Sequence, residues 1–399
     1  MPENGFDAKA KKKLALTFIL LFGLVSALGD VTYEGARSVY GPYLGLLGAS
    51  AVTIGFVSGL GEFAGYFLRL VSGYLIDRTK KYWLITILGY GMLVAVPLLA
   101  LAGRWEIAAL FIILERTGKA IRSPGKDAML SHAAKKMGTG TGFGIHEAMD
   151  QVGGIIGPLI FTAALTLFGG FKQGFTVMWI PALLAVVVLL LARAKVPNPA
   201  ILEEAEPETR EPESFKKALS GAFWLYGLFV FISVVGFVNF PIISYHLSAQ
   251  KVISLALIPL LYAVAMAVDA VAALIIGKIY DKIRLDALMI IPLLTFPIAV
   301  LGFSGHYISV IMAILLWGSV MGIHETILRA AVADLTPMES RGTAYGIFNT
   351  LYGAAMLTGS VVIGLLYEYS RIYLVVFVVA IEFIAFILVA LYRKLMMSL

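Results

Sequence analysis

Long runs without charge restrict the fold of this sequence more than any other feature. Residues 179–192 contain no charged side chain, and residues 374–391 contain only Glu382. A helix that crosses a membrane needs about 20 apolar residues. A membrane β-barrel would instead show segments of alternating polarity, each about 10 residues long. The runs therefore predict an all-α integral membrane protein.

Length and composition set the number of helices. Hydrophobic residues make up 60% of the 399 residues and charged residues 14%, whereas a soluble protein carries about 25% charged residues. Breaking the apolar runs at charges, glycines and prolines predicts twelve transmembrane helices and no large soluble domain. The predicted helices cover residues 14–45, 49–76, 82–102, 104–132, 140–168, 174–194, 217–247, 251–277, 286–304, 307–334, 341–368 and 371–394.

An internal duplication relates the two ends of the chain. Residues 73–78 resemble residues 277–282, and residues 140–145 resemble residues 342–347 at nearly the same offset. Two matches at one offset predict two pseudo-symmetric halves of six helices each. Parallel repeats of this kind are typical of transporters, whose halves rock about a site near the middle of the membrane.

A polar segment separates the two predicted halves. Residues 196–215 combine four prolines with six glutamates, a composition that cannot build a packed core. We therefore predict a first half at residues 1–195, a flexible cytoplasmic linker at residues 196–215 and a second half at residues 216–399.

Positive charge in the connections predicts the orientation. Cytoplasmic loops of membrane proteins carry an excess of lysine and arginine. If both termini are cytoplasmic, basic clusters such as Lys80 and Lys81 lie inside. The loop cations left outside are then Arg104, Lys172, Lys251 and Arg371. We expect a multi-pass protein of the cytoplasmic membrane, and the net charge of +6 then needs no nucleic-acid partner.

Two motifs resemble those of a known family, the major facilitator superfamily. The connection after the second predicted helix is similar to the family's loop signature, a glycine, an aspartate and a basic cluster: Gly73, Asp77, Arg78, Lys80 and Lys81. Thr79 stands where the family usually has a further glycine. The resemblance covers essentially the whole chain and implies the family's twelve-helix fold and transport by alternating access.

The fifth predicted helix resembles the antiporter signature of that family. Gly144, Gly153, Gly157 and Pro158 match its spacing, but its final glycine pair is replaced by a phenylalanine and a threonine. In the family this signature marks exporters, so the resemblance implies efflux. Glycines also permit close helix approach, and proline bends a helix. We expect Gly153, Gly157 and Pro158 to act in gating, with ordinary tight packing as the alternative.

Aspartates at two equivalent helix ends predict a second gating element. Asp77, beside Arg78, ends the second predicted helix, and Asp281 ends the eighth. A carboxylate there can dock on the positive amino end of a helix in the opposite half. Such contacts would close the cytoplasmic side. The alternative is a charged turn that only sets the topology.

Ionisable residues inside predicted helices point to the functional site, because each costs about 2.5 to 3.5 kcal/mol at the bilayer centre unless it faces protein or water. They concentrate in the first half, so we expect that half to couple protons and the more aromatic second half to contact substrate. The proton-coupling candidates are Asp30, Glu34, Glu115, Arg116 and Asp150. The substrate-binding candidates are Arg37, Glu62, Lys119, Arg122, Glu147, His324 and Glu325.

Other roles for these charges stay open. They could form interhelical ion pairs that only hold the bundle together, and we expect that role for Glu382. Residues 115–122 loosely resemble the arginine motif linked to proton transfer in exporters of the family. Asp30, Glu34 and Arg37 share one helical face, so Arg37 would compete with a proton for the two carboxylates.

The function predicted from these patterns is proton-coupled efflux of small organic compounds. Lys119, Arg122 and Lys126 on one face motivate an alternative, proton-coupled uptake of an anionic metabolite. A divalent-metal exporter and a membrane sensor or scaffold are further alternatives. No phosphate-binding loop or nucleophile motif is present, so we expect no enzyme, no cofactor and no bound metal. The expected partners are a small-molecule substrate, protons and the bilayer, and the expected state is a monomer.

Overall fold

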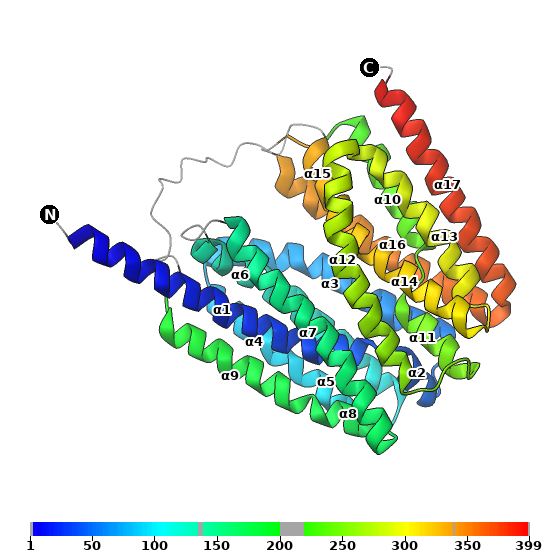
Figure 1. Cartoon of the computed structure of the whole chain (residues 1–399), viewed down its shortest axis with the longest axis horizontal. Helices are drawn as coiled ribbons and strands as arrows, with labels where there is room; N and C mark the ends of the chain where they lie inside the picture. Colours follow the sequence, from blue (N-terminus) through cyan, green and yellow to red (C-terminus); the bar gives the residue numbers. More distant parts are fainter. Residues whose placement is uncertain (1–2, 135–138, 200–218, 338–339, 398–399) are drawn as a thin grey trace. The chain divides into compact units, whose positions relative to one another are not determined.

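A computed structural model describes residues 3–134, 139–199, 219–337 and 340–397 (Figure 1). These ranges contain helices and no strand. The first elements are α1 (Glu3–Arg37), α2 (Tyr40–Leu46), α3 (Ala51–Thr79), α4 (Tyr82–Gly91), η1 (Met92–Val94), α5 (Ala95–Leu98), η2 (Leu99–Leu101), α6 (Trp105–Ala134), α7 (Thr139–Phe168), α8 (Phe171–Val177) and α9 (Trp179–Lys195). The remaining elements are α10 (Gly221–Gly236), α11 (Phe240–Ala249), α12 (Leu257–Ile283), η4 (Arg284–Met289), α13 (Ile290–Gly302), α14 (Tyr307–Ile323), η5 (His324–Leu328), α15 (Arg329–Leu335), α16 (Arg341–Tyr369) and α17 (Arg371–Met397).

The predicted all-α, twelve-helix architecture is confirmed. Short helices that follow one another, such as α4, η1, α5 and η2, together form one of the predicted crossings. In the described ranges, ten segments are long and apolar enough to span a membrane. One of them, Leu257–Gly302, contains both α12 and α13. Outside these ten segments lie the short α2 and the long α6, which carries too many charges for a purely apolar span.

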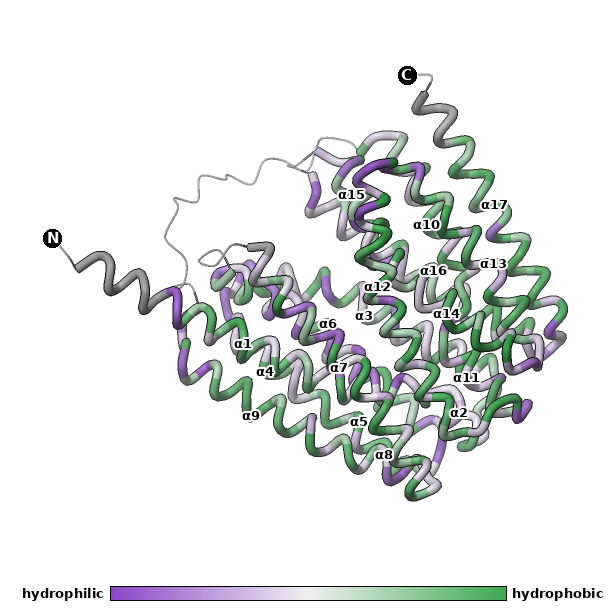
Figure 2. The backbone as a smooth tube through the Cα atoms, in the orientation of Figure 1, coloured by the Kyte–Doolittle hydropathy of each residue, from purple (hydrophilic) through white to green (hydrophobic). Residues whose placement is uncertain are grey.

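Apolar side chains cover the outside of several helices, as expected for a surface that faces lipid. Leu183 and Leu190 on α9 are exposed, as are Leu274 on α12 and Phe383 on α17. Figure 2 shows α9 and α17 as largely hydrophobic along their length. Exposed apolar surface of this extent marks contact with a membrane or a partner rather than with water.

The chain packs as two compact units. The first consists of Met1–Ala36, Leu68–Ala102 and Leu110–Arg210. The second consists of Arg37–Phe67, Gly103–Ala109 and Glu211–Leu399. Residues 37–67 thus pack with second-half helices. The predicted halves rest on the sequence duplication and stay a prediction, and most of the predicted linker lies outside the described residues.

An aromatic core fixes α1 in the first unit. Phe18 and Phe22 pack with ring centroids 4.6 Å apart, and Phe22 lies 5.7 Å from Trp83 of α4. Buried side chains of α6 and α9, including Met129 and Leu189, complete this core. This core holds α1 against α4, α6 and α9.

A second aromatic core surrounds the break between α10 and α11 in the second unit. Trp317 of α14 is fully buried and stacks on Phe237 with centroids 5.7 Å apart. Its indole nitrogen donates to the carbonyl of Val238 at 2.9 Å. This bond satisfies a backbone group that the broken helix leaves without its usual partner.

Glycines allow close packing at the outer end, meaning the end of the helices that the charge pattern predicts to face outside. Gly41 of α2 contacts the carbonyl of Pro241 in α11, and Gly59 of α3 lies against the backbone of Leu357 in α16. Any Cβ at Gly41 or Gly59 would collide with those backbones. Residues 37–67 are therefore tightly closed against α11 and α16 in this structure.

One backbone feature repeats at equivalent positions of the duplicated segments. Lys80 has a φ of 54° and Arg284 a φ of 50°, although neither is a glycine. Each lies three residues after the aspartate of its repeat, Asp77 or Asp281. A positive φ therefore recurs at the ends of α3 and α12, which agrees with the duplication read from the sequence.

Candidate functional site

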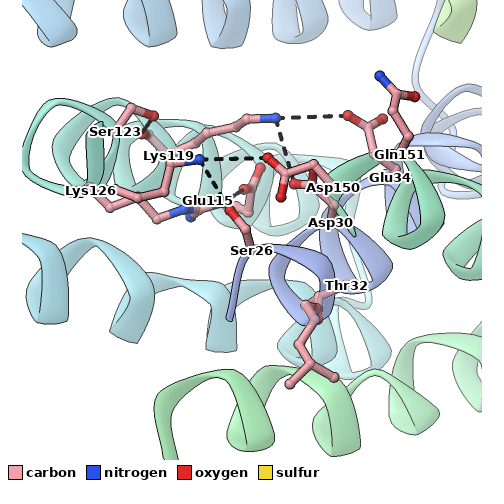
Figure 3. Close-up of polar contacts among 12 residues, drawn as sticks. Ser26, Asp30, Thr32, Glu34, Glu115, Lys119, Ser123, Lys126, Asp150 and Gln151 are labelled. Carbon is pink, nitrogen blue, oxygen red and sulfur yellow. Dashed lines mark hydrogen bonds and ion pairs between the residues drawn. The ribbon is translucent and has the colours of Figure 1, made fainter. Parts of the chain in front are cut away.

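Three helices of the first unit bring their charges together, as Figure 3 shows. Helix α6 presents Glu115, Lys119, Arg122 and Lys126 on one stripe, since residues three and four apart share a helix face. Helix α1 contributes Asp30 and Glu34, and α7 contributes Asp150. We call the set the charge network: Asp30, Glu34, Glu115, Lys119, Arg122, Lys126 and Asp150.

Lys119 links α6 to α1 within the charge network. Its Nζ lies 4.0 Å from Oδ1 of Asp30 and 3.8 Å from Oε1 of Glu34. The same ammonium lies 4.0 Å from the centroid of the Tyr33 ring, and the Arg116 guanidinium lies 4.4 Å from that centroid. Tyr33 therefore holds two cations by cation–π attraction.

Lys126 links α6 to α7 and α1. Its Nζ lies 3.6 Å from Oδ2 of Asp150 and donates a hydrogen bond to Oγ of Ser26 at 3.1 Å. His146, one turn before Asp150, places its Nδ1 3.5 Å from the same carboxylate oxygen. Oδ1 of Asp127, whose side chain is 59% exposed, lies 4.0 Å from the same Nζ of Lys126.

Glu115 is the most deeply buried acid of the charge network, with a side chain 0% exposed. Its Oε1 lies 3.8 Å from a guanidinium nitrogen of Arg122, which in turn stacks 4.8 Å from the Tyr90 ring centroid. Within the part of the chain that the structure describes, neither oxygen of Glu115 has a hydrogen-bond partner, and neither has Nη1 of Arg122.

The ion pairs of the charge network are loose. The nitrogen–oxygen distances named above for Lys119, Arg122 and Lys126 with the network's carboxylates run from 3.6 to 4.0 Å. Buried ions repay their desolvation only when geometry is good and the remaining hydrogen bonds are made. Pairing alone therefore does not account for so many charges here. The arrangement suits groups that exchange a proton or receive a ligand.

A small cavity opens within the charge network. It measures about 70 Å³. The residues that line it are Ser26, Asp30, Tyr90, Lys119, Arg122, Ser123, Lys126 and Asp150. All of these side chains are polar, so the cavity suits water or a charged ligand group rather than an apolar one.

The glycines of α7 hold this helix against α1. Gly153 contacts the carbonyl of Ala27, and Gly157 contacts the carbonyl of Val31 and the backbone of Gly35. Pro158 follows inside the same helix and is buried. The spacing read as an antiporter signature thus places the backbone of α7 directly on α1, next to the charge network.

Arg37 and Glu62, predicted to bind substrate, form a tight buried pair in the second unit. A guanidinium nitrogen of Arg37 donates to Oε1 of Glu62 at 2.9 Å, and both side chains are at most 10% exposed. The short distance contrasts with the loose pairs of the charge network.

Removing one partner of this pair is expected to be costly. Arg37→Ala removes this cation from the buried Glu62 carboxylate, which should lower the free energy of unfolding by about 3 to 5 kcal/mol. The apolar double variant Arg37→Met/Glu62→Leu should stay near the parent protein. Thermal unfolding of purified protein in detergent measures both. If the single and double variants lose the same amount of stability, the unpaired charge is not the cause of the destabilisation.

His324 lies apart from the charge network, in the second unit. It begins η5, a π-helical turn, and its Nδ1 is 3.1 Å from the hydroxyl of Tyr352. Tyr352 contacts the Tyr66 ring at 4.9 Å. π-Helical turns often mark functional sites, and no pattern in the sequence predicted this one.

The remaining predicted residues are exposed. Glu147 contacts Gln151 at 3.3 Å, and Glu325 follows His324 on the exposed side of η5. Asp77 and Arg78 lie at the exposed end of α3, and Asp281 lies at that of α12. Contacts from these aspartates to the opposite half stay a prediction.

Sequence reasoning missed four polar members of the site: Ser26, Tyr33, Tyr90 and Ser123. Ser26 and Tyr33 lie one turn from Asp30 on α1, and that spacing could have found them. Nothing in the sequence of α4 distinguished Tyr90. Among the described residues, no three His, Asp or Glu side chains gather so that they could hold a metal ion.

Known proteins share both the sequence pattern and the fold of this chain. Residues 14–323 and 228–396 match the Major Facilitator Superfamily. The chain belongs to this superfamily, and it is a multi-pass membrane transporter. It is 41% identical over 377 residues to an uncharacterized protein of Mycobacterium tuberculosis, covering 94% of this chain and 92% of that protein. It is 29% identical over 365 residues to an uncharacterized MFS-type transporter of Methanocaldococcus jannaschii, covering 88% and 89%.

Solved transporter structures share the fold at low sequence identity. A POT family transporter superposes with a TM-score of 0.75 at 14% identity, covering 95% of this chain and 96% of that chain. The nucleoside transporter NupG superposes with a TM-score of 0.70 at 14% identity, covering 94% and 98%. A bacterial homolog of the human lysosomal transporter Spinster, in an inward-facing state, superposes with a TM-score of 0.71 at 15% identity, covering 96% of this chain and 98% of that chain. The fold is that of secondary transporters.

Proposed function

We propose that this chain is a proton-coupled secondary transporter of small molecules and that its proton site is the charge network of α1, α6 and α7. The observation that carries the proposal is a set of buried or half-buried carboxylates whose oxygens lie 3.6 to 4.0 Å from the charged nitrogens of Lys119, Arg122 and Lys126. A carboxylate held this way can take up a proton without breaking a tight pair with these cations.

Protonation changes the forces between the helices. A proton on Asp150 removes the charge that attracts Lys126, and that ammonium can then turn toward Asp127 or Ser26, which already lie beside it. A proton on Glu34 weakens the hold of Lys119 on α1 in the same way. Loading and release of protons would therefore alter the contacts of α6 with α1 and α7, which is the coupling that alternating access needs.

Two observations favour different directions of transport. The α7 glycine spacing around Gly153 and Gly157 resembles that of exporters and favours efflux of small organic compounds. The cations Lys119, Arg122 and Lys126 around the cavity favour uptake of an anionic metabolite together with protons.

Flux through purified protein tests the function and its direction. Proteoliposomes hold a mixture of small organic acids, amines and neutral compounds inside, with an isotopically labelled copy of the mixture outside. An inward proton gradient is then imposed, and both pools are measured by mass spectrometry. Loss of internal compounds indicates efflux, and gain of labelled ones indicates uptake. Movement of no compound in response to the gradient would contradict proton-coupled transport.

The exposed aspartates at the ends of α3 and α12 are proposed to form the cytoplasmic gate with Arg78. Asp77→Asn is expected to weaken this gate, because a carboxylate on the amino end of a helix contributes about 0.3 to 2 kcal/mol. The mutant population should shift toward the inward-open state.

Spin labels measure this shift, because the chain has no native cysteine and introduced ones are unique. Labels on the cytoplasmic ends of the two halves should show longer distances in Asp77→Asn. Glu106→Gln, at the opposite end of a membrane helix, serves as the control. Unchanged distances in Asp77→Asn would leave the aspartate with only a topological role.

A further inference from the structure

We propose that the cavity of the charge network binds the oxyanion head group of the substrate, a carboxylate or a phosphate, and that protons on the carboxylates of the network strengthen this binding. The proposal rests on the proton site proposed above and adds the chemical class of its ligand.

The donors around the cavity suit an oxyanion. Lys119, Arg122 and Lys126 all line it, and none makes a direct hydrogen bond to a carboxylate of the charge network at the observed distances. Arg122 is 5% exposed at its side chain, and its Nη1 has no hydrogen-bond partner in the described part of the chain. Ser26 and Tyr90 add hydroxyl groups at the same wall. Charge-assisted hydrogen bonds from such groups are strong and hold carboxylates and phosphates well.

The size of the cavity fits a head group rather than a whole metabolite. Its volume is about 70 Å³. A cavity needs roughly 10 to 15 Å³ in this measure for each water molecule, so this one has room for several waters or for one carboxylate or phosphate group. The rest of a larger substrate would have to lie outside it.

The charges that face the cavity decide when an anion can enter. The charge network has three cations, Lys119, Arg122 and Lys126, and four carboxylates, Asp30, Glu34, Glu115 and Asp150. Only two of the four carboxylates, Asp30 and Asp150, line the cavity together with the three cations. Each proton that a carboxylate of the charge network takes up removes a negative charge and makes the cavity more favourable for an anion.

Arg116 is a buried neighbouring cation, and with it the cations and the carboxylates are equal in number when every carboxylate is ionised. Arg116 lies on the Tyr33 ring, and His146 contacts Asp150. Asp127 and Glu147 are largely exposed to the surroundings, so their charges are better screened than those of the buried acids. Tyr90 contributes a hydroxyl from α4.

This balance fixes the sign of coupling. If protons strengthen anion binding, the bound anion strengthens proton binding by the same factor. Substrate and protons then travel in the same direction. This coupling therefore favours uptake of an anion together with protons over proton-driven efflux.

Anion binding and proton uptake can be measured on the purified full-length protein without knowing the substrate. Sodium acetate, sodium phosphate and sodium succinate are added to weakly buffered protein that contains a pH indicator. Sodium chloride at equal ionic strength and choline chloride serve as controls. Binding is followed by the rise in unfolding temperature, and proton uptake by the rise in pH. We expect at least one of the three oxyanions to bind with uptake of about one to two protons, so that affinity falls at least about tenfold per pH unit above the optimum.

Two variants assign the binding to the cavity. Arg122→Gln should weaken binding at least about tenfold, because a hydrogen bond from a charged donor is lost. Arg122 is deeply buried, so Lys126→Gln, at a side chain 15% exposed, provides a second test if the first variant unfolds. Arg104→Gln, an exposed arginine before α6, is the matched control and should bind as the parent does. Acetate binding would identify a carboxylate site, and phosphate binding a phosphate site.

The inference is overturned if none of the three anions raises the unfolding temperature more than sodium chloride does. It is also overturned if binding releases protons, or if both cavity variants bind the anions like the parent protein. Its failure is distinguishable from failure of the proton site. If no oxyanion binds and Asp150→Asn still loses gradient-driven transport, the proton site stands and the anion site falls. If oxyanions bind with proton uptake and Asp150→Asn still transports against a gradient, the anion site stands without the proton role of Asp150.

Discussion

Asp150→Asn is expected to abolish proton-driven accumulation of substrate in proteoliposomes while leaving exchange at equal concentrations largely intact. The amide keeps the shape of the carboxyl group but cannot take up a proton. Lys126 therefore loses an ionic partner whose charge depends on protonation. Loss of coupling should reduce gradient-driven accumulation to the level of protein-free vesicles.

Two companion variants make this result specific. Asp30→Asn and Glu34→Gln test the α1 carboxylates at Lys119, of which at least one should also be required. Glu106→Gln changes an exposed carboxylate on the same helix as Glu115 and should transport like the parent protein. Accumulation at the parent level in Asp150→Asn, with both α1 variants also active, would place proton coupling outside the charge network.

Gly157→Ala is expected to have the second large effect, by destabilising the protein. A Cβ at this position would meet the Val31 carbonyl and the backbone of Gly35, neither of which can move as a side chain does. Overpacking of this kind typically costs about 1 to 3 kcal/mol. The displaced α7 should also disturb Asp150 and reduce transport.

Gly144→Ala on the same helix is a matched control. A Cβ at Gly144 meets no atom within 4 Å. Alanine should therefore stabilise the helix slightly, by roughly 0.5 to 1 kcal/mol. The unfolding temperature and the transport rate of both variants measure the difference. If Gly157→Ala is as stable and active as Gly144→Ala, the close contact of α7 with α1 is not needed.

Hydropathy was sufficient to predict the positions of the membrane helices, because every crossing must bury its backbone polar groups in a helix. Breaks inside a crossing were not predictable. Residues 14–45 were expected as one helix, but α1 ends at Arg37 and α2 starts at Tyr40. The π-helical turn at η5 is a second example. Such local changes depend on packing against neighbours, as with Trp317 at the α10–α11 break.

The sequence indicated which side chains of the charge network share a helix, but not which partners they meet across helices. The α6 stripe followed from spacing alone. That Lys119 lies against Asp30 and Glu34 depends on the depth and rotation of two helices, which sequence spacing does not set. Arg37 was expected to compete for the α1 carboxylates, which stays a prediction; its hydrogen bond to Glu62 could not be read from the sequence. The roles assigned to these residues stay predictions until they are measured.

Infrared difference spectroscopy between acidic and alkaline pH tests the central claim most directly, because it detects protonation of carboxyl groups without any substrate. Carboxyls of the charge network should give a protonated C=O band at acidic pH in the parent protein. Asp150→Asn and Glu115→Gln should each remove part of that band, and Glu106→Gln should leave the part assigned to buried carboxyls unchanged. An identical band in the parent and in amide variants of Asp30, Glu34, Glu115 and Asp150 would show that the charge network does not bind the protons.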